Sequence, residues 1–182
     1  MHAPALSLTH DKRLAAFGVI GFAVALAAAS QIAIPLPGTP VPFTLQPMIV
    51  VLAGLMLGPT LGAASMMLYL LVGALGVPVF TPVGAPGIAR LLGPTGGYLI
   101  AYPFAAYATG FVARRASSLA GRFGAALAGM ALIFLGGLAQ LTLLTGSVSQ
   151  AVVVGMTPFA LFDVAKAFFA ALIARPRRAA RD

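Results

Sequence analysis

Six apolar runs, joined by short polar or proline- and glycine-rich connections, dominate this sequence. They cover residues 14–32, 47–57, 61–75, 98–113, 123–144 and 151–174. Only 8% of the 182 residues are charged, whereas about 25% are charged in a typical soluble domain. Such a surface has to face lipid. In lipid, only helices and closed barrels satisfy their backbone hydrogen bonds, and no run alternates as a barrel strand does. The sequence therefore predicts an all-α integral membrane protein, a compact bundle of six transmembrane helices.

The basic residues predict the orientation of this bundle. Nine of the eleven fall in three clusters between or beyond the apolar runs: Lys12 and Arg13; Arg114, Arg115 and Arg122; Arg175, Arg177, Arg178 and Arg181. With the N-terminus in the cytoplasm, six spans place all three clusters inside and leave only Arg90 in an outer loop. We expect one membrane domain over residues 1–182, with a bundle at about 14–174 and basic cytoplasmic tails at 1–13 and 175–182.

Charge placed in this way indicates a lipid bilayer as the partner, with no nucleic acid, because the clusters flank apolar runs. Two outer loops, residues 35–47 and 77–97, are rich in proline and glycine. Proline restricts the backbone before anything binds, so these loops are predicted to form stiff lids over the outer mouth of the bundle. A plain connector is the alternative reading.

Asp163 is the only acidic residue within the apolar runs, and Lys166 follows three positions later. Residues at this spacing share one helix face, and two charges on that face must turn toward the bundle interior. Ionisable residues inside a membrane are candidates for function, although an ion pair that only holds helices together is the alternative. Arg90, in the second outer loop, suits a carboxylate through its forked guanidinium, and an arginine at the lipid headgroup boundary is the alternative.

Enzyme constellations are missing from the sequence. The chain has no cysteine, its two histidines are His2 and His10, and no nucleotide-binding or zinc-protease motif occurs. We therefore predict no catalytic residue, no metal, no cofactor and no enzymatic activity, so any ATP has to be hydrolysed by partner subunits.

Small residues at spacing four in the first run, Gly21, Ala25 and Ala29, permit close helix packing, either with a partner or inside the bundle.

Three segments resemble the signatures of one family. The stretch QIAIPLPGTPVPFTLQ at residues 31–46 resembles the first-loop signature of BioY, the biotin-specific S component of energy-coupling factor (ECF) transporters. The run LGPTGGYL at 92–99 resembles its second signature. Pro158 and Phe159, followed by Asp163 and Lys166, resemble its last-helix signature. The resemblance extends from about residue 14 to residue 174.

The resemblance implies a high-affinity biotin-binding subunit of a prokaryotic cell-membrane vitamin transporter, which captures biotin at the outer face. It implies as partners a transmembrane coupling subunit and ATPase subunits, with the first helix and its small-residue stripe against the coupling subunit. By this resemblance Asp163 and Lys166 contact the ureido ring, and Arg90 and Tyr98 lie near the ligand. Phe43, Gln46 and Phe159 are implied as lid or wall residues.

Two other functions stay open from the sequence. An ion-coupled secondary transporter of a small carboxylate would use Asp163 as its proton site, but such transporters usually show internal repeats and more spans. An intramembrane enzyme would turn over a bound ligand. The sequence does not identify the group that binds the biotin carboxylate, the affinity or the oligomeric state. Nor does it decide whether the coupling module is dedicated or shared, or whether the chain transports alone.

Overall fold

The computed structural model describes residues 5–174, and the regular elements in that range are helices joined by loops. Its helices are α1 (Ala5–Gln31), α2 (Gln46–Leu57), α3 (Pro59–Ala74), α4 (Ala89–Leu92), α5 (Gly96–Ala113), α6 (Leu119–Thr145), α7 (Val148–Gly155) and α8 (Ala160–Ile173). Within these residues the only β pairing is one isolated bridge between Ile34 and Phe43, inside the first outer loop. The predicted all-α class is confirmed.

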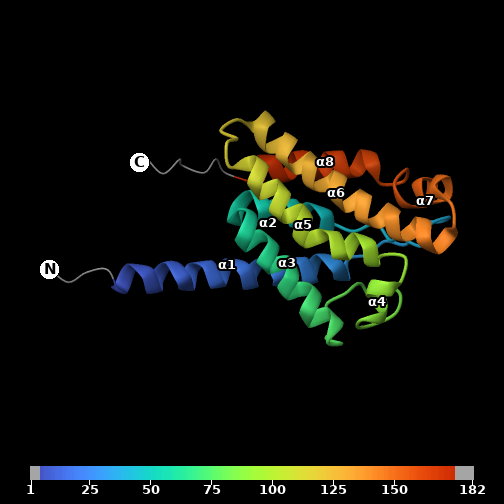
Figure 1. The fold of residues 1–182 in the computed structure, drawn as a ribbon, viewed down its shortest axis with the longest axis horizontal. Helices are drawn as coiled ribbons and strands as arrows, with labels where there is room; N and C mark the ends of the chain where they lie inside the picture. The colour runs from blue at the N-terminus through green and yellow to red at the C-terminus, as the bar shows by residue number, and fades with distance from the viewer. Residues whose placement is uncertain (1–4, 175–182) are drawn as a thin grey trace.

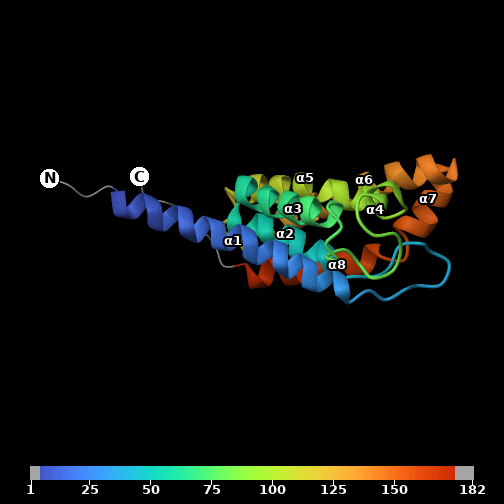
Figure 2. The same ribbon diagram turned by 90° about the horizontal axis from the view of Figure 1, so that it is seen from below.

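Helix α5 is the centre of the bundle. It packs against α2, α3 and α6, while α1 covers α2 and α3, and α8 covers α2 and α6 (Figure 1). Glycine permits the closest crossings: a Cβ on Gly97 of α5 would collide with the Gly136 carbonyl of α6. Seen from below, the first half of α1 extends beyond the other helices (Figure 2).

The hairpin of α2 and α3 follows from two residues. Gly58 has φ of +83°, a left-handed conformation that glycine adopts without steric penalty, and it ends α2. Pro59 then begins α3 at a position where its missing N–H costs nothing. The predicted division of these two runs at positions 58 and 59 is confirmed.

The last apolar run differs from its prediction as one helix. It is divided into α7 and α8, which meet at 55°. Pro158 lies in the break, where it has no backbone N–H to continue the hydrogen-bond ladder of α7. Asp163 consequently falls in the first turn of a new helix rather than in mid-span.

The outer surface of the bundle is apolar. Phe17 of α1 is 72% exposed and Leu143 of α6 is 85% exposed. Among the described residues, two helices are long and apolar enough to cross a membrane, Lys12–Gln31 and Leu119–Thr145, and the bent pair α7–α8 makes a third span if counted as one. Helices α2 and α3 are apolar but shorter. A count of six spans therefore stays a prediction.

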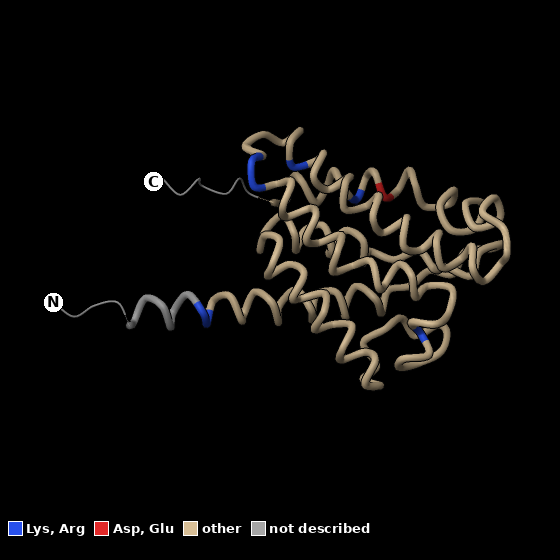
Figure 3. The backbone as a smooth tube through the Cα atoms, viewed as in Figure 1, with Lys and Arg blue, Asp and Glu red and all other residues tan. Residues whose placement is uncertain are grey.

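Two of the three basic clusters, at the start of α1 and around the connection between α5 and α6, lie within the described residues at one end of the bundle. The start of α1, the connection between α5 and α6, and the end of α8 lie at that end, whereas α4, which carries Arg90, lies at the opposite end (Figure 3). Ser118 is the N-cap of α6 at this end, and its hydroxyl accepts a hydrogen bond from the Gly121 N–H at 3.1 Å. The tail cluster Arg175, Arg177, Arg178 and Arg181 is outside the described residues.

Candidate functional site

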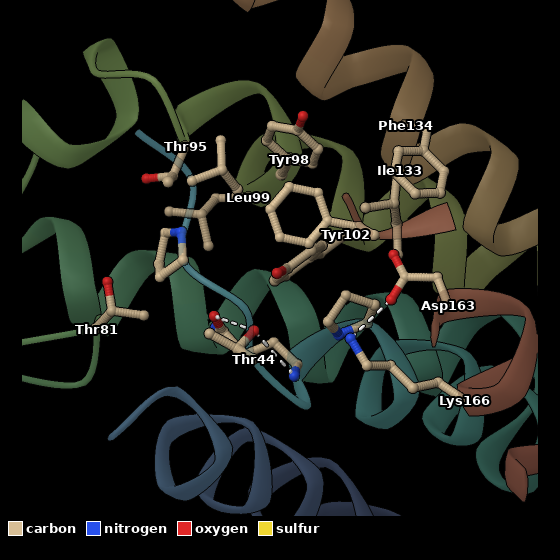
Figure 4. A pocket seen from close by; sticks show the side chains of 15 residues that line it. Thr44, Thr81, Thr95, Tyr98, Leu99, Tyr102, Ile133, Phe134, Asp163 and Lys166 are labelled. Atoms are coloured by element: carbon tan, nitrogen blue, oxygen red, sulfur yellow. Dashed lines mark hydrogen bonds and ion pairs between the residues drawn. The ribbon is translucent and has the colours of Figure 1, made fainter. Parts of the chain in front are cut away.

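A pocket opens among α2, α5, α6, α8 and the two outer loops (Figure 4). Its empty volume, with the opening included, is about 590 Å³. The lining side chains are Val41, Pro42, Thr44, Gln46, Pro47, Thr81, Thr95, Tyr98, Leu99, Tyr102, Ile133, Phe134, Phe159, Asp163 and Lys166. A mostly apolar wall with a few convergent polar groups is the usual form of a small-molecule site.

Asp163 and Lys166 form an ion pair at one side of this pocket. The Lys166 ammonium donates to Asp163 Oδ1 at 2.7 Å, and the two residues are 5% and 6% exposed. The predicted inward face of the last helix is confirmed. Because each charged group keeps hydrogen-bonding capacity beyond this one bond, the pair offers both an acceptor and donors to a polar ligand.

The first outer loop is held against this ion pair. Phe43 places its ring 4.0 Å from the Lys166 ammonium and meets the ring of Phe162 edge-on, with centroids 5.4 Å apart. Its backbone exchanges two hydrogen bonds with Ile34, of 2.8 and 2.9 Å, and these close the loop on itself. The Thr39 hydroxyl donates to the Val154 carbonyl at 2.6 Å and thereby ties the loop tip to α7.

Hydroxyl groups line the side of the pocket away from the ion pair. Figure 4 shows Thr81 and Thr95 there, with Tyr98, Leu99 and Tyr102 between them and Asp163. The Tyr98 hydroxyl donates to the Gly155 carbonyl at 2.7 Å, so it presents mainly its ring to the cavity. The pocket therefore has polar groups at both sides, with the rings of Tyr98 and Tyr102 and the side chain of Leu99 between them.

Arg90 is outside the pocket lining. It is 6% exposed, and its guanidinium donates to the carbonyls of Thr81, at 2.6 Å, and Val83. Its Nε is buried without a hydrogen-bond partner among the described residues. Burial lowers the pKa of the guanidinium from its ordinary value, although not enough to discharge an arginine. A direct contact between Arg90 and a ligand stays a prediction.

The structure brings five of the predicted ligand residues into one cavity: Gln46, Tyr98, Phe159, Asp163 and Lys166. Phe43 contacts that group from the loop. Sequence reasoning missed the lining residues Thr44, Thr81, Thr95 and Tyr102. Thr44 and Thr95 belong to the two loop signatures, and Tyr102 lies one helical turn after Tyr98. The sequence therefore contained signals that could have placed these three residues at the site. Thr81 reaches the pocket only through the path of the second loop.

The small-residue stripe of α1 is only partly accessible. Gly21 is exposed, with open space where a side chain would begin, whereas Ala25 and Ala29 are half-buried. Ala25 and Ala29 are partly covered by the bundle, which fits internal packing. Gly21 leaves room for a helix of a partner to approach closely, which fits a partner contact.

The polar groups of the pocket can bind a ligand that both donates and accepts hydrogen bonds. Within residues 5–174 no three His, Cys, Asp or Glu side chains meet as metal ligands do. The one carboxylate in the pocket lining, that of Asp163, faces an ammonium. This arrangement fits a neutral heterocycle that has both N–H and C=O groups and is joined to an apolar arm.

Comparisons with known proteins identify one family. The model of the BioY family matches residues 7–182. A protein of Pyrococcus horikoshii named "Probable biotin transporter BioY" is 43% identical over 74% of this chain and 79% of its own length. The "Biotin transporter BioY" of Thermotoga maritima is 38% identical over 78% of this chain and 83% of its own.

A solved structure has the same fold. It is described as the S-component for biotin from an ECF-type ABC transporter, and it superposes with a TM-score of 0.83 and 26% identity over 91% of each chain. The apolar exposed helices and these relatives identify a multi-pass membrane protein. The family model matches almost the whole chain, and the relatives are 38–43% identical over about three quarters of it, so this chain is a member of the BioY family.

Proposed function

We propose that the chain is the biotin-binding subunit of an ECF-type vitamin uptake transporter and that the pocket beside Asp163 and Lys166 holds the biotin. The observation that carries the proposal is the buried ion pair in the wall of the pocket. The names of the relatives and of the solved structure support the same ligand.

The chemistry of biotin matches the polar groups of the pocket. Its ureido ring has two N–H donors, which a carboxylate accepts, and one C=O acceptor, to which an ammonium donates. The ligand thus hydrogen-bonds both members of the ion pair without breaking it. The hydrocarbon part of the valerate arm suits the rings of Tyr98 and Tyr102. Its carboxylate would extend toward the hydroxyl groups of Thr81 and Thr95.

Equilibrium titration of the detergent-purified, ligand-free chain with biotin tests the proposal. We expect saturable binding of one biotin per chain without nucleotide or partner subunits. Desthiobiotin, which keeps the ureido ring, is expected to compete, whereas valeric acid is not. A folded, ligand-free chain that shows no heat signal with biotin would refute the assignment.

Transport requires partners in this proposal. The chain carries no nucleotide-binding motif, so a transmembrane coupling subunit and ATPase subunits would supply the energy; the chain itself would act without cofactor and without catalysis.

Gly21 on α1 is the proposed contact with the coupling subunit, because it is exposed and leaves open space around its Cα. Gly21→Leu is expected to reduce assembly with the coupling subunit while biotin binding to the isolated chain is unchanged. Normal assembly of this variant would leave the stripe without a partner role.

The proposed topology has six spans, formed by α1, α2, α3, α5, α6 and the bent pair α7–α8, with both ends in the cytoplasm. It rests on the basic segments at one end of the bundle and on the pocket at the other. Single cysteines at Ser117 and Pro40, both exposed, test it. An impermeant thiol reagent is expected to modify Pro40→Cys from outside the cell and Ser117→Cys only after the membrane is opened. The reverse pattern would invert the topology.

A further inference from the structure

A buried polar chain links the pocket wall to the end of α1. Gln46, which lines the pocket, donates its Nε2 hydrogen to the Tyr69 hydroxyl at 2.9 Å. Tyr69 is 2% exposed and is not part of the pocket lining. Its hydroxyl also lies beside the side chain of Ser30, which is fully buried at the end of α1.

The same chain continues into the second outer loop. Ser30 Oγ lies 2.6 Å from the Val79 carbonyl, and the Gln31 side chain donates to the Phe80 carbonyl at 3.1 Å. The ring of Phe80 meets the ring of Tyr69 edge-on, with centroids 5.3 Å apart. The next residue, Thr81, lines the pocket. Tyr69 therefore lies between two parts of the pocket wall, Gln46 at the start of α2 and Thr81 in the loop.

Tyr69 also sets the direction of the Gln46 amide. Because Gln46 Nε2 donates to Tyr69, Oε1 is left beside the Thr44 hydroxyl, 3.4 Å away, on the pocket side. Without the Tyr69 hydroxyl, a donor that is 97% buried would lose its acceptor or the amide would have to turn over. Leaving a buried donor unpaired is costly, and turning it over changes what the pocket wall offers a ligand.

We propose that Tyr69 is a positioning residue for ligand binding, which acts through Gln46 without touching the ligand. The proposal rests on the biotin-binding function given above. It predicts a specific energetic coupling: removing the Tyr69 hydroxyl weakens binding only while Gln46 is present to be misdirected. A residue that merely stabilises the bundle would lower the melting temperature but would show no such dependence on Gln46.

A double-mutant cycle on the purified full-length chain tests this coupling, with biotin affinity as the readout. Tyr69→Phe keeps the ring against Phe80 and removes only the hydroxyl, and we expect roughly a tenfold loss of affinity, the order expected for one unpaired buried donor. Gln46→Leu is expected to weaken binding as well. The double variant should bind as Gln46→Leu does, with no further loss.

Tyr107→Phe is the matched control, because Tyr107 is 46% exposed on α5 and stacks on Phe111 away from the pocket. It should bind biotin as the wild type does. If Tyr69→Phe does not fold, Tyr69→Met, which keeps an apolar side chain beside Phe80 without the hydroxyl, takes its place in the same cycle. Losses that multiply in the double variant, or wild-type affinity in the variant at position 69, would overturn the role of Tyr69. Absence of biotin binding by the wild type would overturn the proposed function and this inference together.

Discussion

Lys166 and Arg90 are equally buried cations with different surroundings. Each is 6% exposed, but Lys166 pairs with a carboxylate at the wall of the pocket, whereas Arg90 donates to two backbone carbonyls of the second outer loop. The difference teaches that burial of a charge does not by itself identify a ligand contact. The hydrogen-bond partners of a buried cation decide its role: a cation that bonds a side chain in the pocket wall can contact a ligand, whereas one that bonds loop carbonyls stabilises the loop.

The largest effect is expected at the ion pair. Asp163→Asn keeps the side-chain size but replaces an acceptor oxygen with a donor, which then opposes the N–H groups of the ureido ring. A mismatch of this kind costs about 1–3 kcal/mol, equivalent to a roughly tenfold to hundredfold loss of biotin affinity. Isothermal titration of the ligand-free variant measures it.

Stability has to be separated from binding in that experiment, because Asp163→Asn also leaves Lys166 without its counter-charge. The double variant Asp163→Asn with Lys166→Met removes the unpaired ammonium and is expected to recover thermal stability without recovering affinity. A folded Asp163→Asn chain with wild-type affinity would make the pair purely structural and would move attention to Arg90.

An intermediate effect, and of a different kind, is expected at Arg90. Arg90→Lys keeps the charge but not the fork that reaches the carbonyls of Thr81 and Val83. We expect the chain to lose about 2 kcal/mol of stability, seen as a lower melting temperature, while biotin affinity falls less than about fivefold. The opposite result, an unchanged melting temperature with affinity lost as in Asp163→Asn, would establish Arg90 as a ligand contact.

The smallest effect is expected from the lid side of the ion pair. Phe43→Leu keeps apolar bulk but removes the ring that lies 4.0 Å from the Lys166 ammonium. A cation–π contact that is not fully desolvated contributes about 0.5–1 kcal/mol, so affinity should fall about twofold to fivefold at this half-buried position. Phe43→Tyr, which keeps the ring, is the control and should bind as the wild type does. Equal losses in both variants would assign Phe43 to loop packing.

The sequence by itself determined the class of the fold and the identity of its charged centre. Scarcity of charge left no soluble alternative, and a period of 3.6 residues per turn places positions 163 and 166 on one face wherever the helix lies. The loop signatures contained Thr44 and Thr95, although their type alone did not distinguish a pocket wall from a turn.

The tertiary structure alone decided which groups meet. Arg90 turns to the loop because Gly84 leaves room for its guanidinium and two carbonyls accept from it. Tyr69 lies 23 positions from Gln46 and 39 from Ser30, and no local pattern connects them. Asp163 lies in the first turn of a helix because the last run is broken at Pro158. Periodicity in a sequence indicates which face of its own helix a side chain lies on. It does not indicate which residue of another segment contacts that side chain, because this depends on how the helices pack and on the path of the loops across them.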